Sequence, residues 1–438
     1  MTAMGSPSAP AASASPPGAV AALQDARQRT LELVGSVKEP DLERVHTPLM
    51  SPLVWDLGHI AAYEDLWLVH RFGERPLLRE DLAHVYDAFE SPRAHRGELP
   101  YLRAPAAREY LESVRERTLD VIAQRGIADG LLHDLVWRHE QQHNETMLQT
   151  IQLAQLPGYE PPARREPPPA PDPPATGLEL VEIPQGSCTL GAEPTGFAYD
   201  NERPRHRTDV RGYLIGRTPI TNASFLNFVE GGGYQRREWW SDEGWAWKEE
   251  YDISRPAGWT ADGAAEWRLH RLEFLHPHRP VVHVSWFEAD AFSRAHGARL
   301  PTESEWEKAA TWDQERQEAR TYPWGEELPV AGRHANLDHG GCGPDPAGAY
   351  PAGASPYGVL GTLGDVWEWT ASPFEGYPGF VAYPYREYSE VFFGRDHRVL
   401  RGGSWATRAC AITAAFRNWD LPQRRQIFAG FRIARSAA

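Results

Sequence analysis

A proline-rich segment, residues 157–177, sets the strongest limit on how this chain of 438 residues folds. Nine of the residues in PGYEPPARREPPPAPDPPATG are proline. Proline fixes φ and has no backbone N–H to donate, so the segment suits an extended, semi-rigid connector better than a helix or a central strand. A chain of this length also exceeds what one hydrophobic core usually organises. We therefore predict two domains joined by this linker.

The part before the linker has a helical pattern. Between residues 21 and 156 apolar side chains recur at steps of three and four, which is the period of a helix. One such series is Ala107, Leu111, Val114, Thr118 and Val121. We predict a helical bundle for this part.

The part after the linker, residues 178–438, has a different composition. It holds most of the 17 tryptophans, many glycines and prolines, and short β-prone pieces such as LELVEIP and RVLRGGSW. Two helices are indicated by their start signals: Ser285 precedes Trp286 to Ala295, and Thr302 precedes Glu303 to Ala310. We predict an irregular, loop-rich α+β domain.

Composition narrows the possible partners and the compartment. Residues 1–20 are rich in Ala, Ser and Pro and lack the features of a signal peptide, so we predict a disordered tail. A net charge of −15 without a basic cluster disfavours nucleic acid, and no apolar run approaches the ~18 residues of a membrane helix. Three distant cysteines fit a reducing cytoplasm. No obligate protein partner is indicated.

Two histidines in LLHDLVWRHEQQHNETMLQTIQLAQL could share a metal ion. His139 and His143 are four residues apart and so lie one above the other on a helix. The same face carries Leu135, Val136 and Met147, which directs both imidazoles toward the bundle interior. Each could instead be a hydrogen-bonded core histidine. The string also matches H-E-x-x-H, in which Glu140 would be the general base of a zinc protease.

A third ligand must come from another helix. The segment SPLVWDLGHIAAYEDLW offers His59, on a face with Trp55, Tyr63 and Leu66, and helical bundles bring such positions together. His46, His70, His95 and His133 compete with it. Three imidazoles would leave three positions of an octahedral iron open, whereas zinc prefers a tetrahedral site. Gln142 and Glu145 are candidates for orienting the imidazoles.

Longer motifs carry a family resemblance that covers nearly the whole chain after the tail. They are SPLVWDLGHI, HEQQHNETM, DNERPRH, IGRTPITNASFLNFVEGGGY, RLPTESEWEKAA, LGDVWEWT, LRGGSWA and FRNWDLPQRRQIFAGFR. With these motifs the chain resembles the sulfoxide synthases of ergothioneine biosynthesis. The resemblance implies an α+β multidomain fold: a DinB-like four-helix bundle, then a C-type-lectin-like domain, similar to formylglycine-generating enzyme, from about Leu178 to Ala438.

The resemblance also implies a reaction and a metal. Family members use a non-heme Fe(2+) ion and O2 to join the sulfur of γ-glutamylcysteine to C2 of the imidazole of hercynine, which leaves a sulfoxide. It places iron on His59, His139 and His143, with the active site between the two domains. Forming the C–S bond and oxidising the sulfur each remove two electrons, which together reduce one O2. No organic cofactor is needed.

Site residues follow from the same resemblance, position by position. Tyr385 in PYREYSEVFFG matches a catalytic tyrosine that delivers a proton or a hydrogen atom. Asp420 matches the group that pairs with the γ-glutamyl amine. The residues matching the hercynine pocket are Gln142, Tyr388, Asn418 and Trp419. The arginines matching carboxylate-binding positions are Arg93, Arg96 and Arg424.

Four alternatives stay open on the sequence. A relative that uses free cysteine and a selenoneine synthase that uses a selenosugar share the same plan. The H-E-x-x-H string is also compatible with a zinc-dependent hydrolase. A lectin-like domain can also serve only as a binding module.

Overall fold

The computed structural model describes residues 16–127, 130–162 and 165–437, which form two compact units. The first unit runs to Asn144 and includes Thr195–Phe197; the second comprises Glu145–Pro194 and Ala198–Ala438. The division of contacts falls inside a helix, before the proline-rich segment that we predict as the linker. The reason is that residues beyond Asn144 bond within the second unit: Gln152 Nε2 donates to the Trp267 carbonyl (2.7 Å), and the Arg165 N–H donates to the Gly340 carbonyl (2.5 Å).

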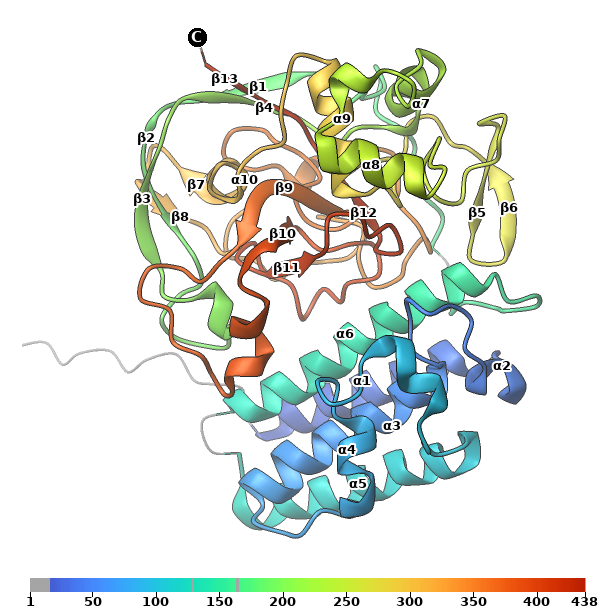
Figure 1. The fold of residues 1–438 in the computed structure, drawn as a ribbon. Helices are drawn as coiled ribbons and strands as arrows, with labels where there is room; N and C mark the ends of the chain where they lie inside the picture. The colour runs from blue at the N-terminus through green and yellow to red at the C-terminus, as the bar shows by residue number, and fades with distance from the viewer. Residues whose placement is uncertain (1–15, 128–129, 163–164, 438) are drawn as a thin grey trace, which may run out of the picture. The chain divides into compact units, whose positions relative to one another are not determined.

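Helices make up the first unit, as predicted. Figure 1 shows α1 (Pro16–Val34), α2 (Glu39–Glu43), α3 (Leu53–Glu64), α4 (Ala83–Tyr86), α5 (Ala104–Arg125) and α6 (Leu131–Ala154), the last of which continues into the second unit. A π-helical stretch, Asp65–Phe72, directly continues α3, and short 3-10 turns cover Glu80–Leu82 and Arg93–Glu98. The apolar series predicted on α5, from Ala107 to Val121, is buried. Gly126 ends α5 with φ of 72°, a conformation that suits glycine.

The start of α1 corrects the predicted tail. We predicted disorder for residues 1–20, but α1 begins at Pro16. Proline is favoured in the first turn of a helix, where its missing N–H costs no hydrogen bond. Ala19 and Leu23 then bury on the bundle side of α1. Residues 1–15 lie outside the described part of the chain.

Short strands and helices make up the second unit, as the α+β prediction required. One sheet has the order β1–β4–β13, and a second has the order β11–β10–β9–β12. Their bounds are β1 (Leu180–Ile183), β4 (Tyr213–Gly216), β9 (Trp367–Phe374), β10 (Gly394–Arg401), β11 (Arg417–Asp420), β12 (Ala429–Gly430) and β13 (Ala434–Ser436). Hairpins pair β2 (Gly186–Leu190) with β3 (His206–Val210), β5 (Ala265–Arg268) with β6 (Arg271–Phe274), and β7 (Trp312–Asp313) with β8 (Glu318–Ala319).

Four helices accompany these sheets: α7 (Asn222–Glu230), α8 (Asp242–Glu250), α9 (Trp286–Ala295) and α10 (Glu303–Thr311) (Figure 1). The two predicted helices, α9 and α10, are confirmed. Ser285 and Thr302 cap them, and each start is a capping box. Short 3-10 turns cover Asp200–Glu202, Arg237–Trp239, Pro351–Gly353, Arg386–Tyr388 and Glu390–Phe392. Among the described residues, no helix combines the length and the apolar character that crossing a membrane requires.

Candidate metal centre and substrate-binding residues

Three histidines of the first unit converge on one point. His59 comes from α3, and His139 and His143 lie one turn apart on α6. One ligand nitrogen from each lies within 4.8 Å of the others, and the Nε2 atoms of His59 and His139 are 3.2 Å apart. The structure thus brings together the two histidines predicted from helical spacing and the third implied by the resemblance.

The opposite ring nitrogens of two of these histidines have their own partners. His59 Nδ1 lies 2.7 Å from the Tyr86 carbonyl, and His143 Nδ1 lies 3.0 Å from Asp56 Oδ1. Each contact favours a proton on Nδ1, which leaves Nε2 as a lone-pair donor. A metal-binding imidazole is usually oriented in this way, so the donor set fits a metal ion.

Burial favours the neutral form of two of these imidazoles, those of His59 and His139. The pKa of His59 is held well below its ordinary value by burial first and then by His143. The pKa of His139 is lowered in the same way by burial, His143 and His59. The rings are also packed: Trp55 stacks on His59 with centroids 4.9 Å apart, and Tyr63 stacks on His139 at 3.6 Å. Neutral, fixed imidazoles are the form that binds a metal ion.

Asp56 is a candidate functional residue that the sequence analysis missed. It is buried and lies one turn before His59 on α3, so an acidic residue three positions before a candidate ligand was the available signal. Glu145, which we considered for the orienting role, does something else. Its carboxylate accepts hydrogen bonds within the second unit from Trp367 Nε1 (2.7 Å), Ser404 Oγ (2.7 Å) and Thr407 Oγ1 (2.9 Å).

Glu140, the acidic residue of H-E-x-x-H, belongs to a buried charge cluster. Its Oε1 accepts from Arg27 Nε (2.9 Å) and Thr30 Oγ1 (2.7 Å), and its Oε2 lies 3.3 Å from Arg115 Nη2. Both arginines also bind the buried carboxylate of Glu64, at 2.7–2.9 Å. With both oxygens engaged, Glu140 balances the arginines between the helices and is poorly suited to take a proton from a metal-bound water.

The two candidate arginines of the first unit differ in exposure. Arg93 is exposed, whereas Arg96 is buried on the same 3-10 turn. Arg96 donates to the Ser91 carbonyl (2.8 Å) and to Ser51 Oγ (2.8 Å), and its guanidinium carbon lies 3.7 Å from the centroid of the Trp55 ring. Burial lowers the pKa of Arg96 to about 10. Gln142, the other candidate in this unit, is half-buried on α6.

The candidate tyrosines lie together in the second unit. Tyr385 and Tyr388 bracket a short 3-10 turn, with ring centroids 6.1 Å apart and nearly perpendicular planes. Tyr388 stacks on Tyr199 at 5.0 Å and meets the edge of Trp419 at 6.3 Å. Trp419 in turn stacks on Phe374 at 4.1 Å. The structure therefore gathers three of the predicted residues into one aromatic group.

The polar candidates for substrate binding in the second unit lie on β11 and just after it. Asn418, Trp419 and Asp420 are consecutive on β11, and Asp420 Oδ1 lies 3.6 Å from Nε of Arg424. Gln426 Nε2 donates to the other oxygen of Asp420 at 3.2 Å, a contact that the sequence analysis did not anticipate. A carboxylate beside a guanidinium offers complementary charges for a zwitterionic group.

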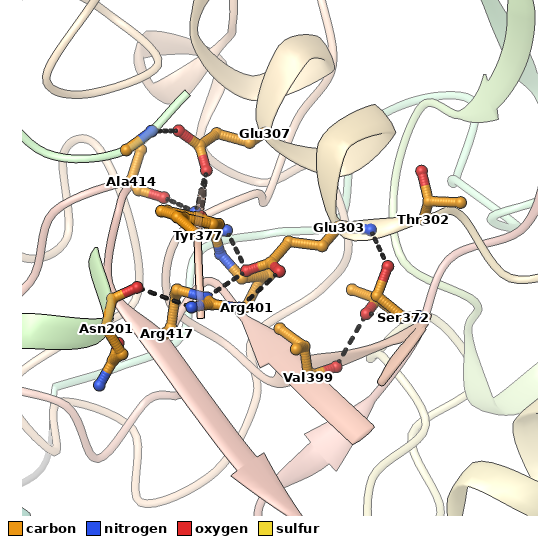
Figure 2. A network of polar contacts seen from close by, with 12 residues as sticks. Asn201, Thr302, Glu303, Glu307, Ser372, Tyr377, Val399, Arg401, Ala414 and Arg417 are labelled. Atoms are coloured by element: carbon orange, nitrogen blue, oxygen red, sulfur yellow. Dashed lines mark hydrogen bonds and ion pairs between the residues drawn. The ribbon is translucent and has the colours of Figure 1, made fainter. Parts of the chain in front are cut away.

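A buried ion-pair network holds β10 and β11, and Figure 2 shows it. Arg417, the first residue of β11, forms two hydrogen bonds to the Glu303 carboxylate, at 2.7 and 2.9 Å. Arg401 of β10 binds Glu303 at 2.7 Å and Glu307 at 2.8 Å (Figure 2). Because Arg417 immediately precedes Asn418, this network fixes the strand that carries three candidate substrate-binding residues.

Comparison with known proteins agrees with this arrangement. A family model described as "DinB superfamily" matches residues 22–154, and one described as "Sulfatase-modifying factor enzyme 1-like domain" matches residues 165–437. The predicted fold class, a DinB-like helical bundle followed by a C-type-lectin-like domain, is confirmed.

Two curated hercynine oxygenases match nearly the whole chain. The chain is 46% identical to the hercynine oxygenase of Mycolicibacterium thermoresistibile over 94% of this chain and 93% of the relative. It is 44% identical to the hercynine oxygenase of Mycobacterium tuberculosis over 94% of this chain and 97% of the relative. The formylglycine-generating enzyme of Thermomonospora curvata is 33% identical over 44% of this chain and 70% of its own.

The similarity to hercynine oxygenases over nearly the whole chain defines the protein as an oxygenase, an enzyme of the oxidoreductase class. The chain belongs to the hercynine oxygenase family.

Proposed function

We propose that this enzyme is an iron(II)-dependent sulfoxide synthase that uses O2 to join the sulfur of γ-glutamylcysteine to C2 of the hercynine imidazole. The observation that carries the proposal is the three-imidazole cluster, whose ligand atoms lie within 4.8 Å of one another in a chain of this family. His59, His139 and His143 would hold the iron. The bound iron would supply oxygen activation and a site for a thiolate, which suits a redox-active metal better than zinc.

The proposed reaction balances in atoms and electrons. Hercynine, thiol and O2 give the S-oxide and one water. The C–H and S–H bonds are lost, a C–S bond forms, and one oxygen atom is transferred to sulfur. Each of the two oxidations removes two electrons, and O2 accepts all four. No external reductant enters the reaction.

The chain's own residues would bind the substrates and move one proton. The Tyr385 phenol carries a transferable proton, which suits a general acid. Trp419 and Tyr388 offer aromatic faces to the trimethylammonium group of hercynine. The Asp420–Arg424 pair would bind the ammonium and carboxylate ends of the γ-glutamyl group, with Arg93 and Arg96 as further carboxylate partners. Gln142 and Asn418 would contribute amide contacts to hercynine.

A substrate panel tests the proposal. Purified enzyme, reconstituted anaerobically with iron(II), is given O2 and hercynine with γ-glutamylcysteine, free cysteine or a selenosugar, and products are identified by mass spectrometry. We expect the S-oxide of the dipeptide to dominate. The Tyr385→Phe variant should keep iron and substrates but lose C–S bond formation, with thiol oxidation in its place.

Two results of the same experiment would contradict the proposed function. Absence of S-oxide from γ-glutamylcysteine would overturn the proposed thiol, and preference for cysteine or the selenosugar would replace it. Tightly bound zinc together with peptide cleavage that Glu140→Gln abolishes would overturn the oxygenase chemistry altogether. The cluster of Arg27, Arg115 and Glu64 around Glu140 argues against that last outcome.

A further inference from the structure

Asp200 accepts hydrogen bonds from both ends of the chain segment that carries Tyr385. It opens the 3-10 turn Asp200–Glu202 and is buried. Its Oδ2 accepts from the backbone N–H of Tyr383 at 3.3 Å, and its Oδ1 accepts from the hydroxyl of Ser389. One carboxylate therefore joins residues six positions apart, with Tyr385 and Tyr388 between them.

The segment between these two contacts, residues 383–389, has an exposed side. Tyr383 within it is 46% exposed, and the flanking Val381 and Val391 are 76% and 47% exposed, so packing covers this part of the chain only in part. Ser389, in contrast, is fully buried against Asp200. A segment with few buried apolar groups depends strongly on its polar anchors for a fixed position.

Asp200 is itself held in place. The neighbouring Asn201 carbonyl accepts from Arg417 Nη1 at 2.6 Å, which ties this turn to the network of Figure 2. The preceding residue, Tyr199, stacks on Tyr388 at 5.0 Å and on Phe416 at 5.5 Å. The turn thus links the rigid ion-pair network on one side with the tyrosine segment on the other.

We infer that Asp200 is a positioning residue for the reaction: its carboxylate holds residues 383–389 so that the Tyr385 phenol and the Tyr388 ring keep their reactive placement. The inference rests on the proposed function, because it assigns Asp200 an effect through Tyr385. A proton donor that shifts by about an ångström can lose on the order of 100-fold in rate, so a positioning group behind it matters.

Three variants and one control test the inference in the full-length, iron-loaded enzyme. Asp200→Asn keeps the size of the side chain but can accept from only one of the two donors through its single oxygen. Ser389→Ala removes one contact and spares Asp200. Asp209→Asn is the matched control, because exposed Asp209 also accepts from a serine hydroxyl, that of Ser187, in the same unit.

The readout is S-oxide formed per O2 consumed, with hercynine and γ-glutamylcysteine as substrates. The competing product is the sulfinic acid, which forms from the thiol and one O2. We expect Asp200→Asn to lower the rate of S-oxide formation on the order of 10-fold or more and to lower the yield per O2. Ser389→Ala should act in the same direction and more weakly, while Asp209→Asn should match the unsubstituted enzyme.

A double variant separates positioning from general stabilisation. In a Tyr385→Phe background, where thiol oxidation replaces C–S bond formation, Asp200→Asn should cause no further change in the rate of thiol oxidation, because the phenol through which it acts on the reaction is already removed. Additive effects, or an unchanged yield in Asp200→Asn, would overturn the inference. Should Asp200→Asn fail to fold, Ser389→Ala in the two backgrounds decides the question alone.

Amide exchange gives a readout that does not depend on the reaction. Exchange across residues 383–389 should accelerate in Asp200→Asn and stay unchanged in Asp209→Asn. Unchanged exchange in Asp200→Asn would overturn the inference even if the enzyme is active. Faster exchange in an enzyme that makes no S-oxide from any thiol would instead support the structural part of the inference and reject the proposed function.

Discussion

At the scale of single residues, Asp56 contacts His143, one of the proposed metal ligands. This contact orients the ring and favours a proton on Nδ1. Removing such a partner typically lowers metal affinity about 10- to 100-fold. We therefore expect Asp56→Ala to weaken iron(II) binding by about that factor, and Asp56→Asn to weaken it less because an amide oxygen can still accept.

Anaerobic competition with a chromophoric chelator measures this affinity. Glu112→Gln is the control, because Glu112 is exposed on α5 and loses the same charge without touching the histidines. Equal affinities in Asp56→Ala and Glu112→Gln would show that His143 needs no orienting partner.

His283 gives a residue-level prediction about pH. It is buried in the second unit beside the Arg425 carbonyl, and burial lowers the pKa of its imidazole to about 4. The unfolded chain takes up a proton near the ordinary value of 6.5, while the folded protein resists protonation until about pH 4. Stability is therefore lost as the pH falls from 6.5 toward 4, by about 3 kcal/mol from this residue.

Replacing His283 with Asn should remove that slope. The backbone there has φ of 62°, which asparagine tolerates. Denaturant unfolding between pH 4 and 6.5 should show a pH dependence weaker by up to one proton in His283→Asn, and unchanged in His95→Asn, where the imidazole is 68% exposed. A slope equal to that of the unsubstituted protein would contradict the assignment.

At the scale of elements, β11 depends on the ion-pair network beneath it. Glu303 is shared by Arg401 and Arg417, so Glu303→Gln leaves two buried guanidinium groups without their common partner (Figure 2). Breaking a buried pair in this way costs about 3–5 kcal/mol. We expect Glu303→Gln to lower the free energy of unfolding by about that amount and to weaken hercynine binding through β11.

Two measurements test this prediction: unfolding in guanidinium chloride gives the change in stability, and KM for hercynine gives the change in binding. Glu315→Gln is the control, because Glu315 is exposed in the same unit. A Glu303→Gln variant with normal stability would show that other donors compensate for the lost charge.

The elements that the sequence predicts are those whose signals are local. Capping residues mark the starts of α9 and α10, and a three-and-four period marks α5, so these could be predicted. Sheet order could not, because β12 pairs with β9 in parallel although they are far apart in the chain. The proline-rich segment, which we predict as a linker, shows no partner in its sequence pattern. Arg165, however, binds Asp345 and Tyr350, a contact across 180 positions or more.

The candidate site also has a part that the sequence predicts and a part that only the structure shows. The His139 and His143 pair follows from helical spacing alone, whereas His59 required the family resemblance to be chosen among several histidines. Asp56 and His143 are 87 positions apart, so their contact appears only in three dimensions. The clamp from Asp200 to Ser389 spans 189 positions and was likewise invisible in the sequence.

At the scale of the whole molecule, the three histidines that we propose as metal ligands all lie in the first unit. Iron(II) at 100 times its dissociation constant stabilises the closed, metal-bound state by about 2.7 kcal/mol. The free energy of every opening that releases the metal rises by that amount. Because the ligands tie α3 to α6, we expect amide exchange in Leu53–Glu64 and in residues 131–144 to slow up to about 100-fold when iron is added. Exchange in β9 and β10 of the second unit should change far less.

Hydrogen-exchange mass spectrometry with and without iron(II) measures this difference, and His139→Asn should abolish the protection. The physical basis is that metal binding raises the free energy only of those openings that separate the three histidines. Equal protection of β9 and β10 would mean that the cluster opens only when the whole chain unfolds, and protection retained in His139→Asn would place the metal elsewhere. Protection confined to α3 and α6 would locate the metal by a measurement independent of catalysis.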